Sequence, residues 1–446
     1  MPARRPFAIR GYRGWIIAAI AVATLLPLTA GADQIHWNDP LGGSFHDASN
    51  WNPATIPGPS DIATFGTVRL ERTYTVTFSE DVVTRAISTG LGADATLDLG
   101  GHAYTVTQEI LVPTGNLTLA GGTLTSPATL IGWSDPAREA ASFTQNGGTH
   151  AVRSGTTRGT LNLIAPNRTY HLNGGTLDAD VMNRGSFNHT GGTVAGDVRS
   201  EGNGVYTVSR GSGSGAGTRV IQGDVRNFGG EFRVTGTDVR VGGEFINSRG
   251  VVRLTGGATL HLLRRFTNVE DSYVTAGPGD VIATSDNFWI NEGSADRTLW
   301  DTDQAELRFV AGSLGGQHSL RVVGTDVGRS AAGYVDNFAW GTLALDAGQS
   351  LALLDPDGPP ERGALYVGVL SLAEGLSHIG RIRGQGHNIY YDPSLPGNAY
   401  LAGGTYPLPE GGAIIPIPEP GVAWAGLVAA LAFLRRRRNN SGATAS

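Results

Sequence analysis

The feature that most restricts the fold is a Gly-Gly pair that recurs between two short alternating segments. It appears in LTLAGGTL (117–124), FTQNGGTHAV (143–152), YHLNGGTLDADV (170–181), FNHTGGTVAGDV (187–198) and VRLTGGATLHL (252–262). Apolar and polar residues alternate beside the glycines, which is the pattern of a short strand with one face turned inward. A chain built from such units is expected to fold as a repetitive all-β structure.

A second turn follows at a fixed place in each unit and gives the length of the repeat. Asparagine occupies it in VMNRGSF, VRNFGGEF and FINSRGVV, as Asn183, Asn227 and Asn247, with Ser200 and Asn268 as looser members. Successive members lie 17, 27, 20 and 21 residues apart. A coil of roughly 20 to 22 residues is typical of a parallel β-helix, in which no coil can bury its apolar face without its neighbours.

We therefore predict an all-β fold, a right-handed parallel β-helix with about three strands per coil. The glycine pairs would supply positive φ angles at one corner. The asparagines, which tolerate the left-handed region, would serve another corner and stack into a hydrogen-bonded ladder. The alternative is an array of β-sandwiches with antiparallel hairpins at Gly147-Gly148, Gly174-Gly175 and Gly191-Gly192, because two-glycine turns also suit hairpins.

The first 32 residues have the organisation of a secretory signal peptide. A basic segment is followed by an apolar run from Trp15 to Leu28 and by the small residues Ala30, Gly31 and Ala32. Cleavage after this site would leave Asp33 as the first residue. The alternative is an uncleaved anchor, for which the apolar run is short. The chain has no cysteine, which excludes disulfides, thiolate metal sites and cysteine nucleophiles.

The charge balance narrows the class of partner. Eight arginines lie near the two ends of the chain, at Arg4, Arg5, Arg10, Arg13, Arg435, Arg436, Arg437 and Arg438. Without them, 25 basic residues remain against 39 acidic ones, a net charge of about −14. An acidic exported body argues against nucleic acid or anionic lipid as its partner.

The segment after the signal peptide is rich in aromatic and turn residues. Trp37, Phe45, Trp51 and Phe65 stand among Gly, Pro, Asn and Asp in WNDPLGGSFHDASNWNPATIPGPSDIATFG. Their spacing resembles the opening of many exported repeat proteins of environmental bacteria, where it precedes strand repeats like those of autotransporter passengers. We expect a hydrophobic cap, with a sugar-stacking platform of Trp37 and Trp51 as the alternative.

Acidic residues in the repeats are the candidates for an active site. Asp178, Asp180, Asp197 and Asp224 lie near the DADV and GDV segments, and paired carboxylates can act as acid and base on polysaccharides or bind calcium. Their recurrence favours solvated corners instead. The stretch SFHD (44–47) has the residue types of a triad, but neighbours in a strand alternate faces, and the histidines lack metal-ligand spacing. We predict no catalytic residue, metal or cofactor.

From about Leu343 the repeat gives way to longer alternating segments. GTLALDAGQSLALLDPDG and the aromatic, turn-rich NIYYDPSLPGNAYLAGGTYPL predict further strands that close the last coil. The segment LYVGVLSL…NIYYD…NAYLAGGTYPL…GG…IP resembles the region before the sorting tail in exported repeat proteins of planctomycete-like bacteria.

The C-terminal residues contain three elements in a fixed order. Pro418, Glu419 and Pro420 are followed by an apolar run from Gly421 to Leu434 and by Arg435, Arg436, Arg437 and Arg438. This order resembles the PEP-CTERM sorting signal, with which Gram-negative bacteria present exported proteins to a membrane enzyme called exosortase. The resemblance implies a short transmembrane helix, arginines held in the cytoplasm and a Pro-Glu-Pro motif at the membrane boundary. An ordinary unprocessed anchor is the alternative.

These features divide the chain into a signal peptide (1–32), an N-terminal β cap (33–110), β-solenoid repeats (111–285), further coils with a C-terminal β cap (286–415) and the sorting tail (416–446). We predict an exported structural or matrix protein, not an enzyme, that is anchored transiently and then reaches the cell surface or extracellular space. Its expected partners are an exosortase-type enzyme and an extracellular polysaccharide, with no nucleic acid. The alternatives are a polysaccharide lyase or hydrolase on a β-helix and a carbohydrate-binding surface protein.

Overall fold

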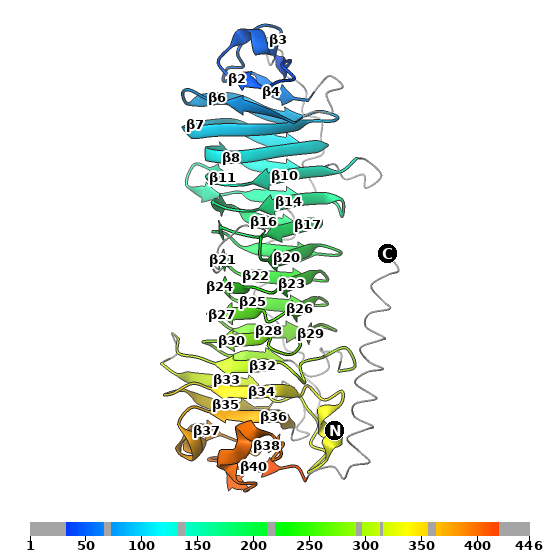
Figure 1. Ribbon diagram of the computed structural model, residues 1–446, viewed down its shortest axis with the longest axis vertical. Coiled ribbons are helices and arrows are strands. Elements are labelled where there is room, and N and C mark those ends of the chain that lie inside the picture. Colours follow the sequence, from blue (N-terminus) through cyan, green and yellow to red (C-terminus); the bar gives the residue numbers. More distant parts are fainter. Residues whose placement is uncertain are drawn as a thin grey trace, which may run out of the picture.

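The computed structural model describes residues 33–66, 73–132, 139–211, 219–290, 297–312, 315–355 and 363–418. These residues form an all-β, parallel solenoid of about 14 turns (Figure 1). The parallel β-helix expected from the repeat is therefore confirmed. The predicted signal peptide, with Ala30 and Ala32, and the tail from Glu419 onward lie outside the described residues. No helix of the part that is described is long and apolar enough to cross a membrane.

The coils stack into three parallel sheets, which we number by their order within a coil. The first sheet contains β2 (Gly43–Ser44), β5 (Tyr74–Thr77), parts of β7 (Asp94–Val112) and β8 (Gly115–Ser126), β10 (Ala141–Gln145), β14 (Arg168–Leu172), β17 (Ser186–His189), β20 (Val205–Ser209), β23 (Glu231–Thr235), β26 (Val251–Thr255) and β29 (Tyr273–Thr275).

The second sheet runs from β6 (Val82–Thr89) to the last strand of the fold. It contains parts of β6, β7 and β8, then β11 (Thr149–Ser154), β15 (Thr176–Asp178), β18 (Thr193–Val194), β21 (Arg219–Ile221), β24 (Asp238–Val241), β27 (Thr259–Leu262), β30 (Val281–Thr284), β32 (Glu306–Phe309), β34 (Trp340–Leu345), β36 (Ala364–Leu372), β38 (Asn388–Tyr391) and β40 (Ala413–Pro416).

The third sheet completes each coil. It contains β1 (Gln34–Trp37), β4 (Ile62–Phe65), parts of β6 and β7, then β9 (Ala128–Ile131), β13 (Thr160–Leu163), β16 (Asp180–Asn183), β19 (Val198–Glu201), β22 (Val225–Phe228), β25 (Phe245–Ser248), β28 (Phe266–Val269), β31 (Phe288–Ile290), β33 (Gln317–Arg321), β35 (Ser350–Leu354) and β37 (Ile382–Arg383).

The remaining elements lie mainly near the two ends of the stack. Three short strands pair antiparallel with a neighbour: β3 (Trp51–Asn52) with β1, β12 (Thr157–Arg158) with β11 and β39 (Tyr406–Pro407) with β40. Four 3-10 helices are present in the described ranges: η1 (Ala48–Asn50), η2 (Ala331–Tyr334), η3 (Gly375–Arg381) and η4 (Pro396–Leu401). Parallel pairing thus runs from β1 to β40, across the boundaries expected at residues 110 and 285.

The Gly-Gly corner explains why the coils do not form hairpins. The second glycine of each pair has a positive φ, 66° at Gly148, 78° at Gly175 and 80° at Gly192. A Cβ atom on Gly175 would lie 2.1 Å from the carbonyl oxygen of Gly148 in the previous coil, and one on Gly192 would lie 2.4 Å from that of Gly175. Glycine is therefore required by both backbone conformation and close stacking. The flanking strands pair in parallel, so the hairpin alternative is wrong.

The asparagine corner forms the predicted ladder, but with another geometry. Asn183, Ser200, Asn227, Asn247 and Asn268 stand in register and are at most 2% exposed. The Asn227 Nδ2 donates to Asn247 Oδ1 at 2.8 Å, and Asn247 Nδ2 donates to Asn268 Oδ1 at 2.8 Å. These side chains point into the core from third-sheet strands, and the backbone of these residues does not adopt the left-handed conformation.

The positive φ angles of that corner lie two residues further along the chain. Arg249 has φ 53° and Glu270 has φ 52°, two residues after Asn247 and Asn268. The Arg249 backbone N–H donates to the Glu270 carbonyl at 2.7 Å, and their side chains form an ion pair at 3.1 Å. The expectation that asparagine itself takes the left-handed conformation is wrong, because its amide is used inside the core.

Aromatic rings fill the middle of the solenoid beneath the first sheet. Phe143, Tyr170, Phe187, Tyr206 and Phe232 stack with centroids 5.2, 5.1, 4.7 and 5.3 Å apart and planes within 14° of parallel. One residue per coil at the same register position produces this column. The column runs through five consecutive first-sheet strands, from β10 to β23.

Two buried histidines pack beside this column. His150 Nδ1 lies 3.1 Å from the Tyr170 hydroxyl, and its Nε2 lies 3.0 Å from Thr129 Oγ1. His189 Nδ1 lies 3.0 Å from the Tyr206 hydroxyl, and its Nε2 lies 3.0 Å from the Gly192 carbonyl oxygen. Burial lowers the pKa of His150 to about 3 and that of His189 to about 4, so both rings are neutral in the folded protein.

The aromatic residues at the N-terminal end form the expected cap. Trp37 is 3% exposed and Trp51 is 2% exposed, and their rings meet edge to face with centroids 4.9 Å apart. Phe45 packs on Trp51 at 4.9 Å, and the Trp51 indole N–H donates to the Phe45 carbonyl at 2.8 Å. A sugar-stacking platform needs exposed ring faces. The alternative of Trp37 and Trp51 as a carbohydrate site is therefore wrong.

Candidate functional site

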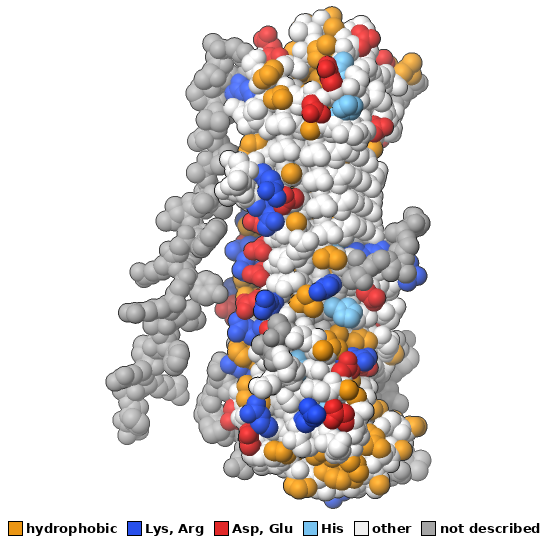
Figure 2. Space-filling model, turned by 90° about the vertical axis from the view of Figure 1, so that its left-hand side faces the viewer, with side chains coloured by type: hydrophobic (Ala, Val, Ile, Leu, Met, Phe, Trp, Pro, Cys, Tyr) orange, Lys and Arg blue, Asp and Glu red, His pale blue; other side chains and the backbone are white. Residues whose placement is uncertain are grey.

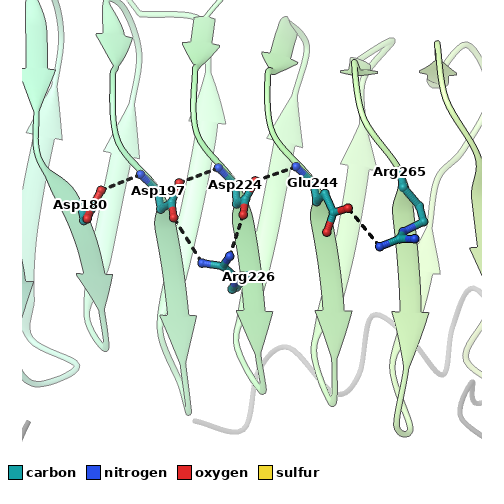
Figure 3. A network of polar contacts seen from close by, with 6 residues as sticks. All are labelled: Asp180, Asp197, Asp224, Arg226, Glu244 and Arg265. Carbon is teal, nitrogen blue, oxygen red and sulfur yellow. Dashed lines mark hydrogen bonds and ion pairs between the residues drawn. The ribbon is translucent and has the colours of Figure 1, made fainter. Parts of the chain in front are cut away.

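Three of the four aspartates that were candidates for catalysis, Asp180, Asp197 and Asp224, lie along one edge of the solenoid (Figure 3). We call this the acidic corner and define it as Asp180, Asp197, Asp224 and Glu244. Each residue stands where the chain turns from the second sheet into the third, directly before the first inward apolar residue of β16, β19, β22 or β25. Because this position repeats once per coil, the four side chains form a column parallel to the axis.

Each aspartate of the acidic corner is bonded to the backbone of the next coil. Asp180 Oδ1 accepts the Asp197 N–H at 3.0 Å, and Asp197 Oδ1 accepts the Asp224 N–H at 2.9 Å. Asp224 Oδ1 then accepts the Glu244 N–H at 2.8 Å. A turn between two sheets leaves these N–H groups outside the strand ladders, and the carboxylates satisfy them.

Glycine before the acidic residue makes room for this bond. A Cβ atom on Gly223 would lie 2.4 Å from Asp197 Oδ1, and one on Gly243 would lie 2.2 Å from Asp224 Oδ1. The GDV and GEF segments of the sequence therefore describe one device. The glycine leaves room for the carboxylate of the preceding coil. The acidic residue in turn places its own carboxylate against the following coil.

Arginines neutralise the repeated negative charge. The guanidinium of Arg226 bridges two coils, with Nη1 3.3 Å from Asp197 Oδ2 and Nη2 2.6 Å from Asp224 Oδ2. Arg265, which follows Glu244 in the column, places Nη2 3.0 Å from Glu244 Oε1. Figure 2 shows acidic and arginine side chains alternating along one edge of the molecule. Stacked like charges at strand spacing repel, and these arginines offset that repulsion.

Asp178 does not belong to the acidic corner, so the grouping of four equivalent aspartates is wrong. Asp178 ends β15 and is 8% exposed, two residues before Asp180. Its carboxylate contacts the guanidinium groups of Arg153 and Arg158, the latter at 2.9 Å. Residues two apart share a face only within one strand, and here the chain turns a corner between them. Asp178 is a largely buried ion-pair centre and not a solvated corner.

Three carboxylates of the described chain are each held between two arginines. They are Asp178 between Arg153 and Arg158, Glu201 between Arg184 and Arg199, and Glu231 between Arg233 and Arg253. Burial alone would raise the pKa of each carboxyl group, but the arginine hydrogen bonds and charges outweigh it and lower the pKa. A general acid for glycoside cleavage needs the opposite shift.

A shallow depression of about 350 Å³ lies beside Pro166, Arg184 and Glu201, at the corner from the third sheet to the first and away from the acidic corner. Its acidic residue is the arginine-clamped Glu201. Among the described residues, no group of three or more histidine, aspartate or glutamate side chains is placed to hold a metal ion.

The remaining sequence candidates are used locally. In the SFHD stretch, His46 Nδ1 lies 3.2 Å from Glu80 Oε1, while Asp47 Oδ1 accepts the Ser49 N–H at 2.9 Å and caps η1. The residues therefore face different partners, and no triad geometry results. Sequence reasoning missed Glu244, which is signalled by its place directly before an inward phenylalanine in the same repeat position as Asp197 and Asp224.

It also missed a half-buried tryptophan on the outer surface of the third sheet. Trp289 lies against two guanidinium groups, with Arg265 Cζ 4.6 Å and Arg321 Cζ 4.5 Å from the ring centroid. Its indole N–H donates to Ser319 Oγ at 2.9 Å. These cation–π contacts occupy the ring surface that a sugar would need. No simple spacing in the sequence brings the three residues together.

Comparisons with known proteins add no relative. No family model, no curated protein and no solved structure matches this chain. The geometry of the solenoid and the motifs of its sequence are therefore the grounds on which a function can be proposed.

Proposed function

We propose that the chain is an exported structural protein of the cell surface or extracellular matrix, which an exosortase-type enzyme processes through the C-terminal tail. Its body would act as a rigid spacer. About 14 coils at a strand spacing of ~4.8 Å give a stack roughly 65 Å long. The proposal includes a right-handed winding of the coils, which is the usual hand of parallel crossovers.

The observation that carries the structural role is the use of polar side chains within the stack. In the acidic corner each carboxylate bonds a backbone N–H of the next coil, as Asp197 does for Asp224 at 2.9 Å. Elsewhere Asp178, Glu201 and Glu231 are clamped by arginines. Groups with these partners hold neighbouring coils together, and their hydrogen-bonding capacity is used within the stack. This arrangement favours a scaffold over a polysaccharide lyase or hydrolase.

The ends of the described fold are compatible with processing at both termini. The first strand begins at Gln34, directly after the predicted signal cleavage site at Ala30 and Ala32. The last strand ends at Pro416, and Pro418 is exposed. The sorting motif then continues with Glu419 and Pro420, and the arginines of the tail follow. The body would thus fill the interval between the two processing signals.

The test uses the full chain in a Gram-negative host with an exosortase system. Glu419→Ala changes the sorting motif, and Glu410→Ala is the matched control, because Glu410 is an exposed glutamate of the C-terminal end whose carboxylate lies 3.9 Å from Arg383. Replacement of Arg435, Arg436, Arg437 and Arg438 by Ser tests the cytoplasmic arginines. Intact mass and surface yield are measured for each.

We expect the parent and Glu410→Ala to lose the tail, Glu419→Ala to keep it, and the serine variant to reach the surface in lower yield. The N-terminus of the exported parent should be Asp33. If Glu419→Ala and the serine variant matched the parent in mass and yield, the sorting proposal would be wrong, and the chain would be a plain solenoid with an incidental apolar tail.

A further inference from the structure

We propose that the C-terminal end of the solenoid lies directly on the lipid headgroups of the membrane while the tail is anchored. We call this surface the basal face and define it by residues 374–383 and 396–418, which contain η3, β37, η4, β39 and β40. The inference rests on the proposed function for insertion of the apolar run, and it adds a folded interaction surface to that function. The partner is the zwitterionic headgroup layer at the edge of the hydrocarbon core.

The first step is that the fold continues to the edge of the sorting motif. The Ile417 N–H donates to the Tyr391 carbonyl at 2.9 Å, and Ile417 is 4% exposed. The carbonyl of Pro416 accepts a bond of 2.9 Å from Arg329 Nε, which belongs to a loop 87 residues earlier. Both residues are therefore fixed to the body, and no flexible spacer lies between β40 and Pro418.

The second step is the length of chain between the folded body and the apolar run. Only Glu419 and Pro420 separate Pro418 from Gly421, where the apolar run begins. Three steps along a fully extended chain span at most about 11 Å. The headgroup layer on each side of a bilayer is about 5 to 8 Å thick. With Gly421 at the hydrocarbon edge, Pro418 cannot be more than a few ångströms outside that layer, and the surface around it must meet the headgroups.

The third step is the character of the basal face. It exposes Leu376, at 47%, together with small apolar residues and prolines, namely Ala399, Ala402, Pro407 and Pro409. Figure 2 shows hydrophobic side chains gathered at this lower end of the molecule. Four of its charges form two pairs, with Arg381 3.3 Å from Glu374 and Arg383 3.9 Å from Glu410. A paired, weakly apolar surface suits a zwitterionic interface, although the body as a whole is acidic.

Apolar exposure alone would not select this end. Leu41, at the opposite end of the solenoid, is 81% exposed. The point where the chain leaves the fold makes the distinction, because the anchor is joined to the basal face and the N-terminal end lies some 14 coils away. The two ends therefore provide an internal comparison for an experiment.

The absence of cysteine allows single labels in the full mature chain. Ala399→Cys places a fluorophore on the basal face, and Ala54→Cys is the matched control at the other end, since both alanines are exposed. The chain from Asp33 to Ser446 is reconstituted into phosphatidylcholine vesicles with and without lipids that carry a nitroxide on the headgroup. A third protein carries Ala399→Cys and a 20-residue Gly/Ser insertion between Ile417 and Pro418.

We expect nitroxide lipids to reduce the Ala399→Cys signal about twofold or more and to leave the Ala54→Cys signal unchanged, since only the first lies within reach of the headgroups. The insertion should restore the Ala399→Cys signal, because a flexible linker of that length has a mean span of ~25 Å. The same loss of signal with the insertion would point to tight binding without need of the short connection, and would overturn the length argument.

Two further outcomes separate the failures. Vesicle-bound protein whose Ala399→Cys signal is unquenched overturns the basal-face proposal and leaves the sorting proposal standing. Energy transfer between labels on neighbouring molecules, without quenching, assigns the face to a second copy and also overturns it. Protein that does not float with vesicles contradicts insertion of the tail, and so removes the membrane stage of the proposed function itself.

Discussion

The asparagine ladder and the acidic corner lie at opposite ends of the third-sheet strands, and both satisfy polar groups where neighbouring coils meet. Both place one polar side chain per coil, and β22 carries Asp224 before its first residue and Asn227 at its third. Asn227 is fully buried, whereas the Asp224 side chain is 29% exposed and shares Arg226. An amide both donates and accepts, so it can continue a buried column without charge, while a carboxylate only accepts and needs an N–H and a cation.

The comparison predicts that a charged side chain is tolerated in the acidic corner and not in the asparagine ladder. Asn247→Asp should lower the free energy of unfolding by about 3–5 kcal/mol, because a buried carboxylate would face groups that now accept from the Asn247 amide. These are Asn268 Oδ1 at 2.8 Å and the carbonyls of Gly250 at 3.1 Å and Tyr273 at 3.3 Å. Urea unfolding followed by circular dichroism measures the change.

The pH dependence of that variant is its control. The difference from the parent should shrink as the pH falls, because a protonated aspartic acid regains one donor. A variant as stable as the parent at neutral pH would contradict the buried ladder.

The second-largest effect is expected from the buried histidines. His150 and His189 are neutral in the folded protein, with pKa values of about 3 and about 4. In the unfolded chain both imidazoles have the usual histidine pKa of about 6.5, so they take up protons when the pH falls below that value. The unfolded state therefore binds more protons, and stability falls as the pH drops from about 6.5 toward 4. The loss from pH 7 to pH 5 should be about 2 kcal/mol for each histidine.

Urea unfolding at pH 7, 6 and 5 measures this slope, and a His189→Gln variant, which cannot titrate at that position, should lack the His189 share of about 2 kcal/mol. The carboxylates held by arginines have lowered pKa values, so their contribution is present above the unfolded-state pKa and is lost only in more acidic solution. Equal stability at pH 7 and pH 5 would show that the histidines are not buried as described.

The glycine corner allows a comparison of two positive-φ positions. Gly175→Ala should cost about 2 kcal/mol or more, because alanine adds a left-handed backbone penalty and a Cβ atom 2.1 Å from the Gly148 carbonyl oxygen. Gly155→Ala has the same kind of φ, 60°, but no atom within 4 Å of the new Cβ, and should cost only about 1 kcal/mol. Similar losses for both would contradict the close stacking of coils.

The smallest effect is expected at the acidic corner. Asp224→Asn retains an oxygen that can accept the Glu244 N–H and loses only the ion pair with the 37% exposed Arg226, so the change should be below about 1 kcal/mol. Thermal unfolding at low and moderate salt measures it. A loss of stability as large as that of Asn247→Asp would mean that burial does not distinguish the acidic corner from the asparagine ladder.

The regular part of the fold was predictable because each coil repeats the same constraints. Gly148 and Gly175 occupy one corner and Asn227 and Asn247 another, and the sequence shows both periods. The left-handed conformation at Arg249 was not predictable, since its penalty of about 1–2 kcal/mol is offset by bonds to the next coil that local sequence does not reveal.

Less of the C-terminal part was predictable from the sequence, because the architecture changes there. After β29 no strand of the described residues continues the first sheet beyond the single bridge from Thr275 to Asp301, and later coils pair only in the second and third sheets. Loops of unequal length and 3-10 helices replace the missing strands, so the spacing of about 20 residues disappears. Contacts such as Arg329 with Pro416 span 87 residues and leave no local signal.

The candidate site was partly predictable for a related reason. The repeat identified Asp180, Asp197 and Asp224 as corner residues, and the structure bears this out. It could not distinguish Asp178, because the turn between β15 and β16 falls between two aspartates that are only two residues apart. The arginine partners come from neighbouring coils, and a single sequence does not show which coils are in register.

The most direct test of the proposed role is the intact mass of the protein recovered from the native cell surface. The account predicts one chain that begins at Asp33, contains the whole body through Ile417, and lacks the apolar run from Gly421 to Leu434 with the arginines that follow. A surface form that still ends at Ser446 would contradict processing of the tail, and one that begins at Met1 would contradict removal of the signal peptide.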